Sequence, residues 1–415
     1  MSEVRRILIS DVCDLNSRST TNLDAYGCIE YLETGSIVRN AISTTQTLYP
    51  KFDEIPSRAK RKVKHGSIIY STVRPNQEHF GYLNHPSENL IVSTGFTTLD
   101  VKDSSVDSRF LFYLLTQKHI TNYLHKIGEN SVSSYPSINP TDIGNLTFRI
   151  PKNRSEQQQI AAVLSALDAK IDCNNRINVE LEAMAKTLYD YWFVQFDFPD
   201  ANGKPYKFSG GKMVYNATLK REIPEGWKAT TLASITPNSN DSVNPADFPE
   251  KEFKHFSIPV FDATNTYGVE RGDSIGSNKF TVLGIDLLVS KLNPWFSRVI
   301  YAMDEEDQIC STELVVWRCP TENLKNFLYL VATSPQFIAH CVQSATGTSN
   351  SHKRVNPTVM MRFDLPYKKE VAEEFGGKIS SIVKKLIISR RENQQLAQLR
   401  DWLLPLLMNG QVTVA

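Results

Sequence analysis

Positively charged side chains gather in one short stretch near the N-terminus, "SRAKRKVKHG" (Ser57–Gly66). The cationic residues of this stretch are Arg58, Lys60, Arg61, Lys62 and Lys64. Lysine and arginine clusters neutralise the phosphates of a nucleic acid and release its counterions. A solvated loop with no ligand is the alternative interpretation, and this stretch alone does not decide between them.

A strand-like run and a turn, "SIIYSTVRP" (Ser67–Pro75), follow the basic cluster at once. Its last residues include the polar side chains of Ser71, Thr72 and Arg74. An arginine can donate two hydrogen bonds to a guanine edge, and hydroxyl groups can contact bases or phosphates. We therefore expect these three residues to contact DNA.

Two further loops are rich in serine and other polar residues: "ENSVSSYPSINP" (Glu129–Pro140) and "GTSNSHKRVNP" (Gly347–Pro357). Ser, Asn, His, Lys and Arg are the residue types that contact base edges and phosphates. The further candidate DNA-binding residues are Ser134, Tyr135, Lys291, Asn350, Ser351, His352, Lys353 and Arg354.

The constellations that an enzyme would need are incomplete. "NPWF" (Asn293–Phe296) is similar to the Asn-Pro-Pro-Phe/Tyr loop of adenine methyltransferases, but it lacks the second proline and an upstream glycine-rich loop. Glu252 and Lys254 supply a Glu-x-Lys pair, yet the one Pro-Asp pair, at Pro199, lies far from them. The sequence has no Walker A motif. We expect no catalytic residues.

Composition narrows the class of protein further. The 415 residues predict two or more domains, and 41% hydrophobic with 22% charged residues is typical of a folded globular chain. Six scattered cysteines without a Cys-x-x-Cys pair, and eight histidines without a His-Glu-x-x-His motif, favour free thiols and no metal. The N-terminus lacks the apolar core of a signal peptide, and no apolar run approaches about 20 residues. A cytoplasmic, prokaryotic protein without membrane contact is expected.

The two halves of the chain repeat one another, with offsets of about 217 residues. "VSTGFTTLD" (Val92–Asp100) is similar to "CSTELVVWR" (Cys310–Arg318), and "SINPTDI" from Ser137 is similar to "RVNPTVM" from Arg354. Two similar helical segments, "RFLFYLL" from Arg109 and "NFLYLVA" from Asn326, lie between them in the same order. Several collinear matches predict a duplicated α+β unit.

Each half ends in a long helix whose apolar residues recur with a heptad spacing, which predicts a coiled coil. The predicted helices run from about Ser155 to Trp192, starting with a Ser155–Gln158 capping box, and from Val371 to Leu404, stopped by Pro405 and Gly410. Two unrelated amphipathic helices are the alternative. The expected seam residues are Ile160, Leu164, Leu167, Ile171, Asn174, Asn178, Leu181, Leu188, Trp192, Ile379, Ile382, Leu386, Asn393, Leu396 and Leu403.

Asparagines interrupt the apolar seam of both helices. A buried asparagine costs stability but fixes register, so we expect antiparallel pairing with Asn174 or Asn178 near Asn393. The first helix then ends in "LYDYWFVQFDFP" (Leu188–Pro199). So many aromatic residues at a helix end predict a structural junction with the second half.

At these helices the chain resembles a known family. Residues 155–199 closely resemble the central conserved region of specificity subunits of type I restriction–modification systems, and "RRENQQLAQLRDWLLPLLMNGQV" (Arg390–Val412) resembles their distal conserved region. "REIPEGWKATTL" (Arg221–Leu232) is similar to the Pro-x-Gly-Trp entry of a target recognition domain. The first half lacks that entry and begins at "VRRILISDV" (Val4–Val12), which leaves the packing of its N-terminus open.

The resemblance implies an α+β fold with two target recognition domains in a pseudo-twofold tandem repeat, separated by two long antiparallel coiled-coil helices. The implied boundaries are 1–150 for the first recognition domain, 151–198 for the central helix, 199–368 for the second recognition domain and 369–415 for the distal helix. The resemblance also implies a function: a non-catalytic, sequence-specific DNA-binding subunit of a phage-defence system.

The implied partners are double-stranded DNA with a bipartite target, two methyltransferase subunits and restriction/translocase subunits. The family members hold no cofactor, and S-adenosylmethionine belongs to the adenine-N6 methyltransferase partner. Two alternatives remain: an orphan or other defence-system specificity module that acts with a methyltransferase only, and a combined methylase or nuclease with degenerate motifs.

Overall fold

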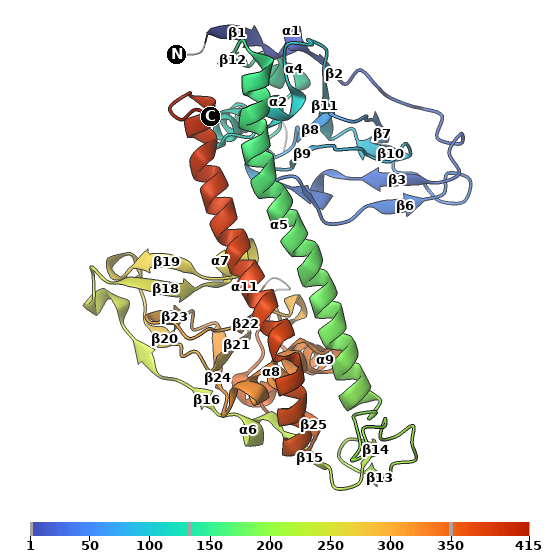
Figure 1. Cartoon of the computed structure of the whole chain (residues 1–415), viewed down its shortest axis with the longest axis vertical. Coiled ribbons are helices and arrows are strands. Elements are labelled where there is room, and N and C mark those ends of the chain that lie inside the picture. The colour runs from blue at the N-terminus through green and yellow to red at the C-terminus, as the bar shows by residue number, and fades with distance from the viewer. Residues whose placement is uncertain (1–2, 132–134, 348–351, 415) are drawn as a thin grey trace. The chain divides into compact units, whose positions relative to one another are not determined.

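The computed structural model describes residues 3–131, 135–347 and 352–414. The chain divides into two compact units, and each takes a part of both long helices (Figure 1). Unit 1 comprises residues 1–172 and 396–415, and unit 2 comprises residues 173–395. Among the described residues, no helix has the length and apolar character to span a membrane.

Unit 1 contains a mixed α/β module over residues 4–151, which we call module 1. One sheet has the order β6 (Gln46–Leu48), β3 (Ile29–Leu32), β10 (Leu90–Ser93), β7 (Ala59–Lys62), in which only β10 and β3 are parallel. The other has the antiparallel order β2 (Cys13–Leu15), β11 (Phe96–Val101), β8 (Ile68–Ser71), β9 (Phe80–Tyr82). Helices α2 (Ser108–Leu115), α3 (Lys118–Glu129) and α4 (Pro140–Gly144) follow, and the short strands β4 (Ile37–Val38) and β5 (Ala41–Ile42) pair with each other.

Unit 2 contains module 2, residues 228–367, with the same plan. Its antiparallel sheet has the order β16 (Asn238–Ser239), β24 (Leu314–Arg318), β21 (Asp286–Ser290), β22 (Val299–Tyr301). Its second sheet has the order β17 (Ser242–Val243), β20 (Lys279–Thr281), β23 (Gln308–Cys310), β18 (Glu252–Phe256), β19 (Gly268–Arg271). Helices α6 (Leu232–Ile235), α7 (Ile258–Thr264), α8 (Glu322–Thr333), α9 (Pro335–Ser344) and α10 (Pro357–Met360) complete it.

The N-terminal strand of module 1 packs in the same way as the first strand of module 2, although the Pro-x-Gly-Trp motif precedes only the latter. Strand β1 (Val4–Leu8) pairs antiparallel with β12 (Thr147–Pro151), and β15 (Lys228–Thr231) pairs antiparallel with β25 (Asp364–Tyr367). One helical turn follows in both, α1 (Ile9–Val12) or α6. The expected duplicated α+β unit is therefore present, and the extra entry of unit 2 is a hairpin of β13 (Met213–Asn216) and β14 (Arg221–Pro224).

The long helices are α5 (Arg154–Tyr189) and α11 (Lys369–Met408), and segments of the two pair antiparallel within each unit. In unit 2, Asn174 Nδ2 donates to Asn393 Oδ1 at 2.9 Å, the contact expected from the interrupted seams. Every predicted seam residue is buried or half-buried. Asn174, Ile379, Leu164 and Leu386 are almost fully enclosed, whereas Asn393 is half-buried.

Two expected helix ends were wrong. Asn153, not Ser155, caps α5, because its side-chain oxygen accepts a hydrogen bond from the Ser155 backbone N–H at 2.9 Å. Helix α11 continues through Pro405 to Met408. A proline removes only one N–H donor from this last turn, while Leu404, Leu407 and Met408 are held in the apolar core of unit 1. The positive φ of Gly410 (69°) follows the true end.

The aromatic residues after α5 form the junction that the sequence predicted. A π-helical turn covers Asp190–Val194, and Tyr189, Trp192, Phe193, Phe196 and Phe198 are buried in one core cluster. Phe193 lies 4.7 Å from Phe327 and 5.7 Å from Trp227 between ring centroids. This cluster joins the end of α5 to strand β14, to α8 and to α11.

Candidate nucleic-acid interface

A tight turn follows β8 in module 1 and presents Arg74 to solvent. Arg74 has a left-handed backbone (φ 46°), Pro75 starts a single 3-10 turn, and Glu78 is again left-handed (φ 58°). The Ser71 hydroxyl donates to Val73 O at 2.9 Å and accepts from Val73 N–H at 3.1 Å. A left-handed arginine costs free energy, so the surrounding bonds must hold the turn.

The same turn recurs after β21 in module 2. Asn293 has φ 49°, Pro294 starts the 3-10 turn and Ser297 is left-handed with φ 49°. The Ser290 hydroxyl bonds to Leu292 O and N–H, both at 3.1 Å. The "NPWF" segment is therefore the counterpart of "RPNQ" in module 1.

Backbone hydrogen bonds join each turn to the serine-rich loop of its module. In module 1, Arg74 N–H donates to Pro136 O (2.8 Å) and Ile138 N–H donates to Thr72 O (2.9 Å). In module 2, Asn293 N–H donates to Lys353 O (2.7 Å) and Val355 N–H donates to Lys291 O (2.9 Å). The structure thus brings together the two kinds of loop that the sequence singled out separately.

Arg58 lies close to the turn of module 1 through a short connecting segment. Arg58 O accepts a hydrogen bond from Thr94 N–H at 2.8 Å, and the next residue, Gly95, accepts from both Thr72 N–H and the Thr72 hydroxyl at 2.9 Å. Arg58 and Arg74 are exposed, Thr72 is half-buried, and Arg74 lies 5.8 Å from the Tyr135 ring centroid. These residues form what we call the module 1 surface: Arg58, Thr72, Arg74 and Tyr135.

The rest of the basic cluster is strand rather than loop. Ala59–Lys62 forms β7, with β10 on one side and backbone bonds to Arg18 and Thr20 on the other. Burial lowers the pKa of Arg61, whose Nε has no hydrogen-bond partner, and Lys62 lies over the Tyr26 ring. Lys60 and Lys64 are exposed.

Some candidate residues do not reach the surface or are already paired. Ser71 is 1% exposed and its hydroxyl is used within the turn, so its side chain is not exposed for the DNA contact that the sequence suggested. Arg354 forms an ion pair with Glu313 at 2.9 Å, which fixes its guanidinium beside the turn of module 2. Lys291 and Lys353 are half-buried and His352 is exposed. Ser134, Asn350 and Ser351 lie outside the described residues.

Sequence reasoning missed the residues that build the turns. Asn293 is one: its side-chain oxygen accepts the Lys353 N–H at 3.1 Å, so it closes the loop pair. A signal was available, because Ser71 with Pro75 and Ser290 with Pro294 have identical spacing. No group of three or more metal-ligating side chains occurs within residues 3–131, 135–347 and 352–414.

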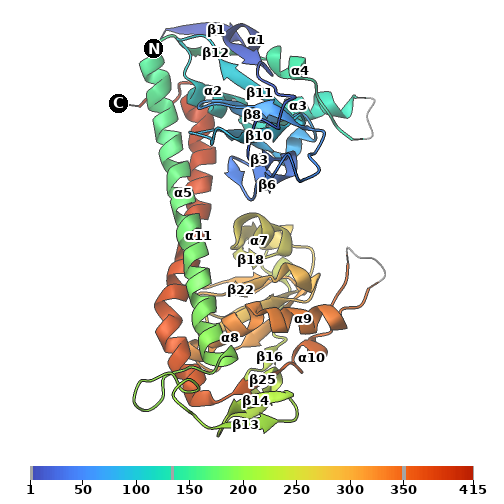
Figure 2. The ribbon, with the colours of Figure 1, turned by 90° about the vertical axis from the view of Figure 1, so that its right-hand side faces the viewer.

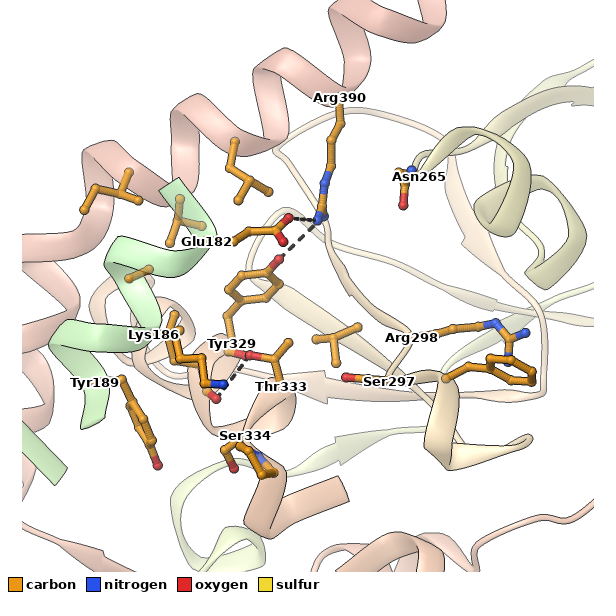
Figure 3. A pocket seen from close by; sticks show the side chains of 18 of the residues that line it. Glu182, Lys186, Tyr189, Asn265, Ser297, Arg298, Tyr329, Thr333, Ser334 and Arg390 are labelled. Carbon is orange, nitrogen blue, oxygen red and sulfur yellow. Dashed lines mark hydrogen bonds and ion pairs between the residues drawn. The ribbon is translucent and has the colours of Figure 1, made fainter. Parts of the chain in front are cut away.

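Each module is fastened to its helix segments by a tyrosine, a carboxylate and an arginine. In unit 1, the Tyr113 hydroxyl donates to Asp168 Oδ2 at 2.5 Å, and Arg400 donates to Asp168 Oδ1 at 2.8 Å. In unit 2, Arg390 donates to Glu182 at 2.7 Å and reaches the Tyr329 hydroxyl at 3.5 Å (Figure 3). The carboxylates come from α5 and the arginines from α11.

These contacts border a cavity in each unit. The unit 2 cavity of about 410 Å³ lies between the helices and the Ser297–Val299 segment of module 2. The unit 1 cavity of about 560 Å³ lies between the helices and the Glu78–Phe80 segment of module 1. The charged lining residues include the ion pairs Glu182–Arg390 in unit 2 and Asp168–Arg400 in unit 1.

Comparison with known proteins finds a family model that matches the first part of the chain. Residues 1–183 match the model of the type I restriction modification DNA specificity domain. The match covers module 1 and most of α5, which is less than half of the chain. The resemblance predicted from the helices is therefore confirmed.

Relatives extend the likeness over the whole chain. The type I restriction enzyme HindI specificity subunit of Haemophilus influenzae is 23% identical over 99% of this chain and 100% of its own length. The MjaIX specificity subunit of Methanocaldococcus jannaschii is 25% identical over 84% of this chain and 78% of its own. The S subunit of a type I system from M. genitalium, 14% identical, has the same fold, with a TM-score of 0.59 and coverage of 98% and 96%.

Proposed function

We propose that this chain is the DNA-recognition subunit of a type I restriction–modification system and that its two modules read the two halves of a bipartite target. The observation that carries the proposal is the duplicated turn, built by the same backbone bonds from different exposed side chains. Shared scaffolding with different side chains suits two modules that perform one task on two sequences.

The chain supplies recognition and no catalysis in this proposal. Methyltransferase subunits, two per chain, would bring S-adenosylmethionine and transfer a methyl group to adenine N6 in each half-target. Restriction subunits would join the same assembly. The names of the HindI and MjaIX relatives support a restriction enzyme context.

The test compares methylated bases in the source strain with those in a strain from which this gene is deleted. We expect one motif made of two short specified sequences and an unspecified gap to lose methylation. A single continuous motif would contradict the two-module division, and an unchanged pattern would contradict the function itself. Methylation by the purified chain alone, given DNA and S-adenosylmethionine, would exclude a pure recognition subunit.

A further inference from the structure

We propose that Arg74 reads a guanine in the half-target of module 1, whereas Arg58 on the same surface contacts a phosphate. This inference deepens the proposed function and rests on it. The observations that carry it are the backbone of Arg74, the neighbours of its guanidinium and the contrast with the same position in module 2.

The backbone aims Arg74 outward at a cost. Its left-handed conformation, φ 46° and ψ 66°, is one that side chains with a Cβ adopt rarely. Pro75 restricts the backbone directly after Arg74. The hydrogen bonds Ser71–Val73 and Arg74–Pro136 hold the backbone before Arg74 and join Arg74 to the neighbouring loop. Strain that the surroundings hold in place is typical of residues with a task.

The guanidinium of Arg74 has an aromatic neighbour and no carboxylate. Its ring partner is Tyr135, with 5.8 Å from guanidinium carbon to centroid, and no ion pair of Arg74 occurs among the described residues. Arg39 of the same module, by contrast, is paired with Glu78. A charged, oriented and unneutralised guanidinium suits the O6 and N7 acceptors of guanine.

A phosphate contact makes smaller demands on geometry than a base contact. Arg58 is exposed and precedes an edge of the basic strand β7, and only its backbone is fixed, by Thr94. Such a residue can follow the DNA backbone wherever the phosphates lie. Base reading needs a side chain held on a rigid element, and within the module 1 surface Arg74 meets that need.

Module 2 shows what the turn looks like without this function. Asn293 occupies the position of Arg74, but its side-chain oxygen is used by Lys353 N–H. The nearby Arg354 is paired with Glu313. The two halves of the target should therefore differ, with the arginine-read guanine in the half that belongs to module 1.

The experiment places Arg74→Ala, Arg74→Gln and Arg58→Ala separately in the chromosomal gene and maps the methylated motif. Arg58→Ala is the matched control, because it removes the same charge from the same surface. For Arg74→Ala we expect one specified guanine, in one half-target only, to become degenerate. For Arg58→Ala we expect the motif to stay the same while methylation falls at all sites alike.

Binding by the purified full chain supplies the second measurement. Wild-type protein should prefer the motif duplex over one with that G·C pair replaced by A·T, by about 5- to 100-fold. Arg74→Ala should abolish this preference, whereas Arg58→Ala should keep it and reduce the slope of log K against log salt by about one. The binding assay decides the matter even if a variant no longer supports methylation in the cell.

Three results would overturn the inference. They are a wild-type motif with no guanine in either half, an unchanged motif in both Arg74 variants, and equal loss of binding to both duplexes in Arg74→Ala. None of them bears on the proposed function, which is tested separately by whether deletion of the wild-type gene removes methylation at a bipartite motif.

Discussion

At the scale of single residues, Lys325 is an ionisable group buried without a carboxylate partner. It is 1% exposed, and its Nζ donates to Gly284 O at 2.7 Å and to Ala302 O at 2.5 Å above the Tyr301 ring. Burial lowers the pKa of Lys325 from 10.5 to about 7. Above pH 7 the unfolded chain therefore binds more protons than the folded chain, so the free energy of unfolding contributed by this group rises with pH up to about 10.

The prediction concerns wild type against Lys325→Met. For unit 2, the melting temperature of wild type minus that of Lys325→Met should increase as the pH is raised from 6 to 9. Calorimetric scans at three pH values measure it, and the buried thiols, which are common to both proteins, cancel in the comparison. Melting temperatures that change in parallel would show that Lys325 keeps its proton when the chain is folded.

A second residue-scale prediction concerns Asn293. Asn293→Ala removes the acceptor of the Lys353 N–H and leaves a left-handed alanine, so the turn should lose about 1–2 kcal/mol of local stability. Hydrogen exchange of the Lys353 amide should become faster in the variant. Exchange at wild-type rates would mean that the backbone bonds alone hold the loop.

Residue types predicted the surface of module 1 better than they predicted roles. Arg58, Thr72 and Arg74 were found from charge and polarity, but Ser71 has the same polarity and is buried in the turn. A serine that bonds its own backbone two residues ahead is indistinguishable, in sequence, from one that faces a ligand. Burial depends on tertiary packing, which the local sequence does not contain.

At the scale of elements, the polar layer between α5 and α11 holds both satisfied and unsatisfied groups. Asn174 Nδ2 donates to Glu392 and Asn393, whereas the side-chain oxygens of Asn174 and of Asn178, which is 7% exposed, have no hydrogen-bond partner among the described residues. A buried acceptor without a donor costs about 1–3 kcal/mol. Asn178→Leu should therefore raise the melting temperature of unit 2.

The matched variant Asn174→Leu should lower that melting temperature, because it removes the hydrogen bonds that Asn174 donates to Glu392 and Asn393. Asparagine pairs of this kind fix the register of a coiled coil. Thermal unfolding followed by circular dichroism measures both variants. Equal effects of the two substitutions would show that the pairing of Asn174 contributes nothing specific.

The link between Asp168 and Arg400 can be measured by a double-mutant cycle. Both side chains are mostly buried, 20% and 14% exposed, and Asp168 also accepts from Tyr113. We expect Asp168→Ala and Arg400→Ala each to destabilise unit 1, with a coupling energy of about 1–3 kcal/mol. Additive effects in urea unfolding would mean that Asp168 and Arg400 lie close together without a net stabilising interaction.

The heptad spacing predicted both long helices and the face that each buries, because an apolar seam is written in the sequence at a regular interval. The ends of the two helices were harder to predict from the sequence. Asn153 outcompetes Ser155 as the cap, and the core contacts of Leu404 and Leu407 carry α11 past Pro405. The links Tyr113–Asp168 and Glu182–Arg390 join segments distant in sequence and have no local signal.

At the scale of the whole molecule, the proposed function makes the paired helices responsible for the gap between half-targets. Inserting seven residues after Asn175 in α5 and seven after Gln394 in α11 keeps the heptad pattern and adds about 10 Å of helix. The unread gap should lengthen by about three base pairs, while both half-targets stay the same. Methylation mapping measures this, and altered half-targets with an unaltered gap would contradict it.

In the turns of both modules, the residues that determine the backbone shape differ from the exposed residues that could determine the DNA sequence that is read. The geometry of the turns rests on main-chain groups of the serine-rich loops, on one serine hydroxyl in each module and, in module 2, on the side-chain oxygen of Asn293. The side chains at the tips of the turns are exposed and take no part in these bonds. Asn76 and Gln77 in one turn, and Trp295 and Phe296 in the other, could be randomised as short cassettes while each scaffold still closes. Selection from such libraries would let one half of the target be rewritten while the other is kept.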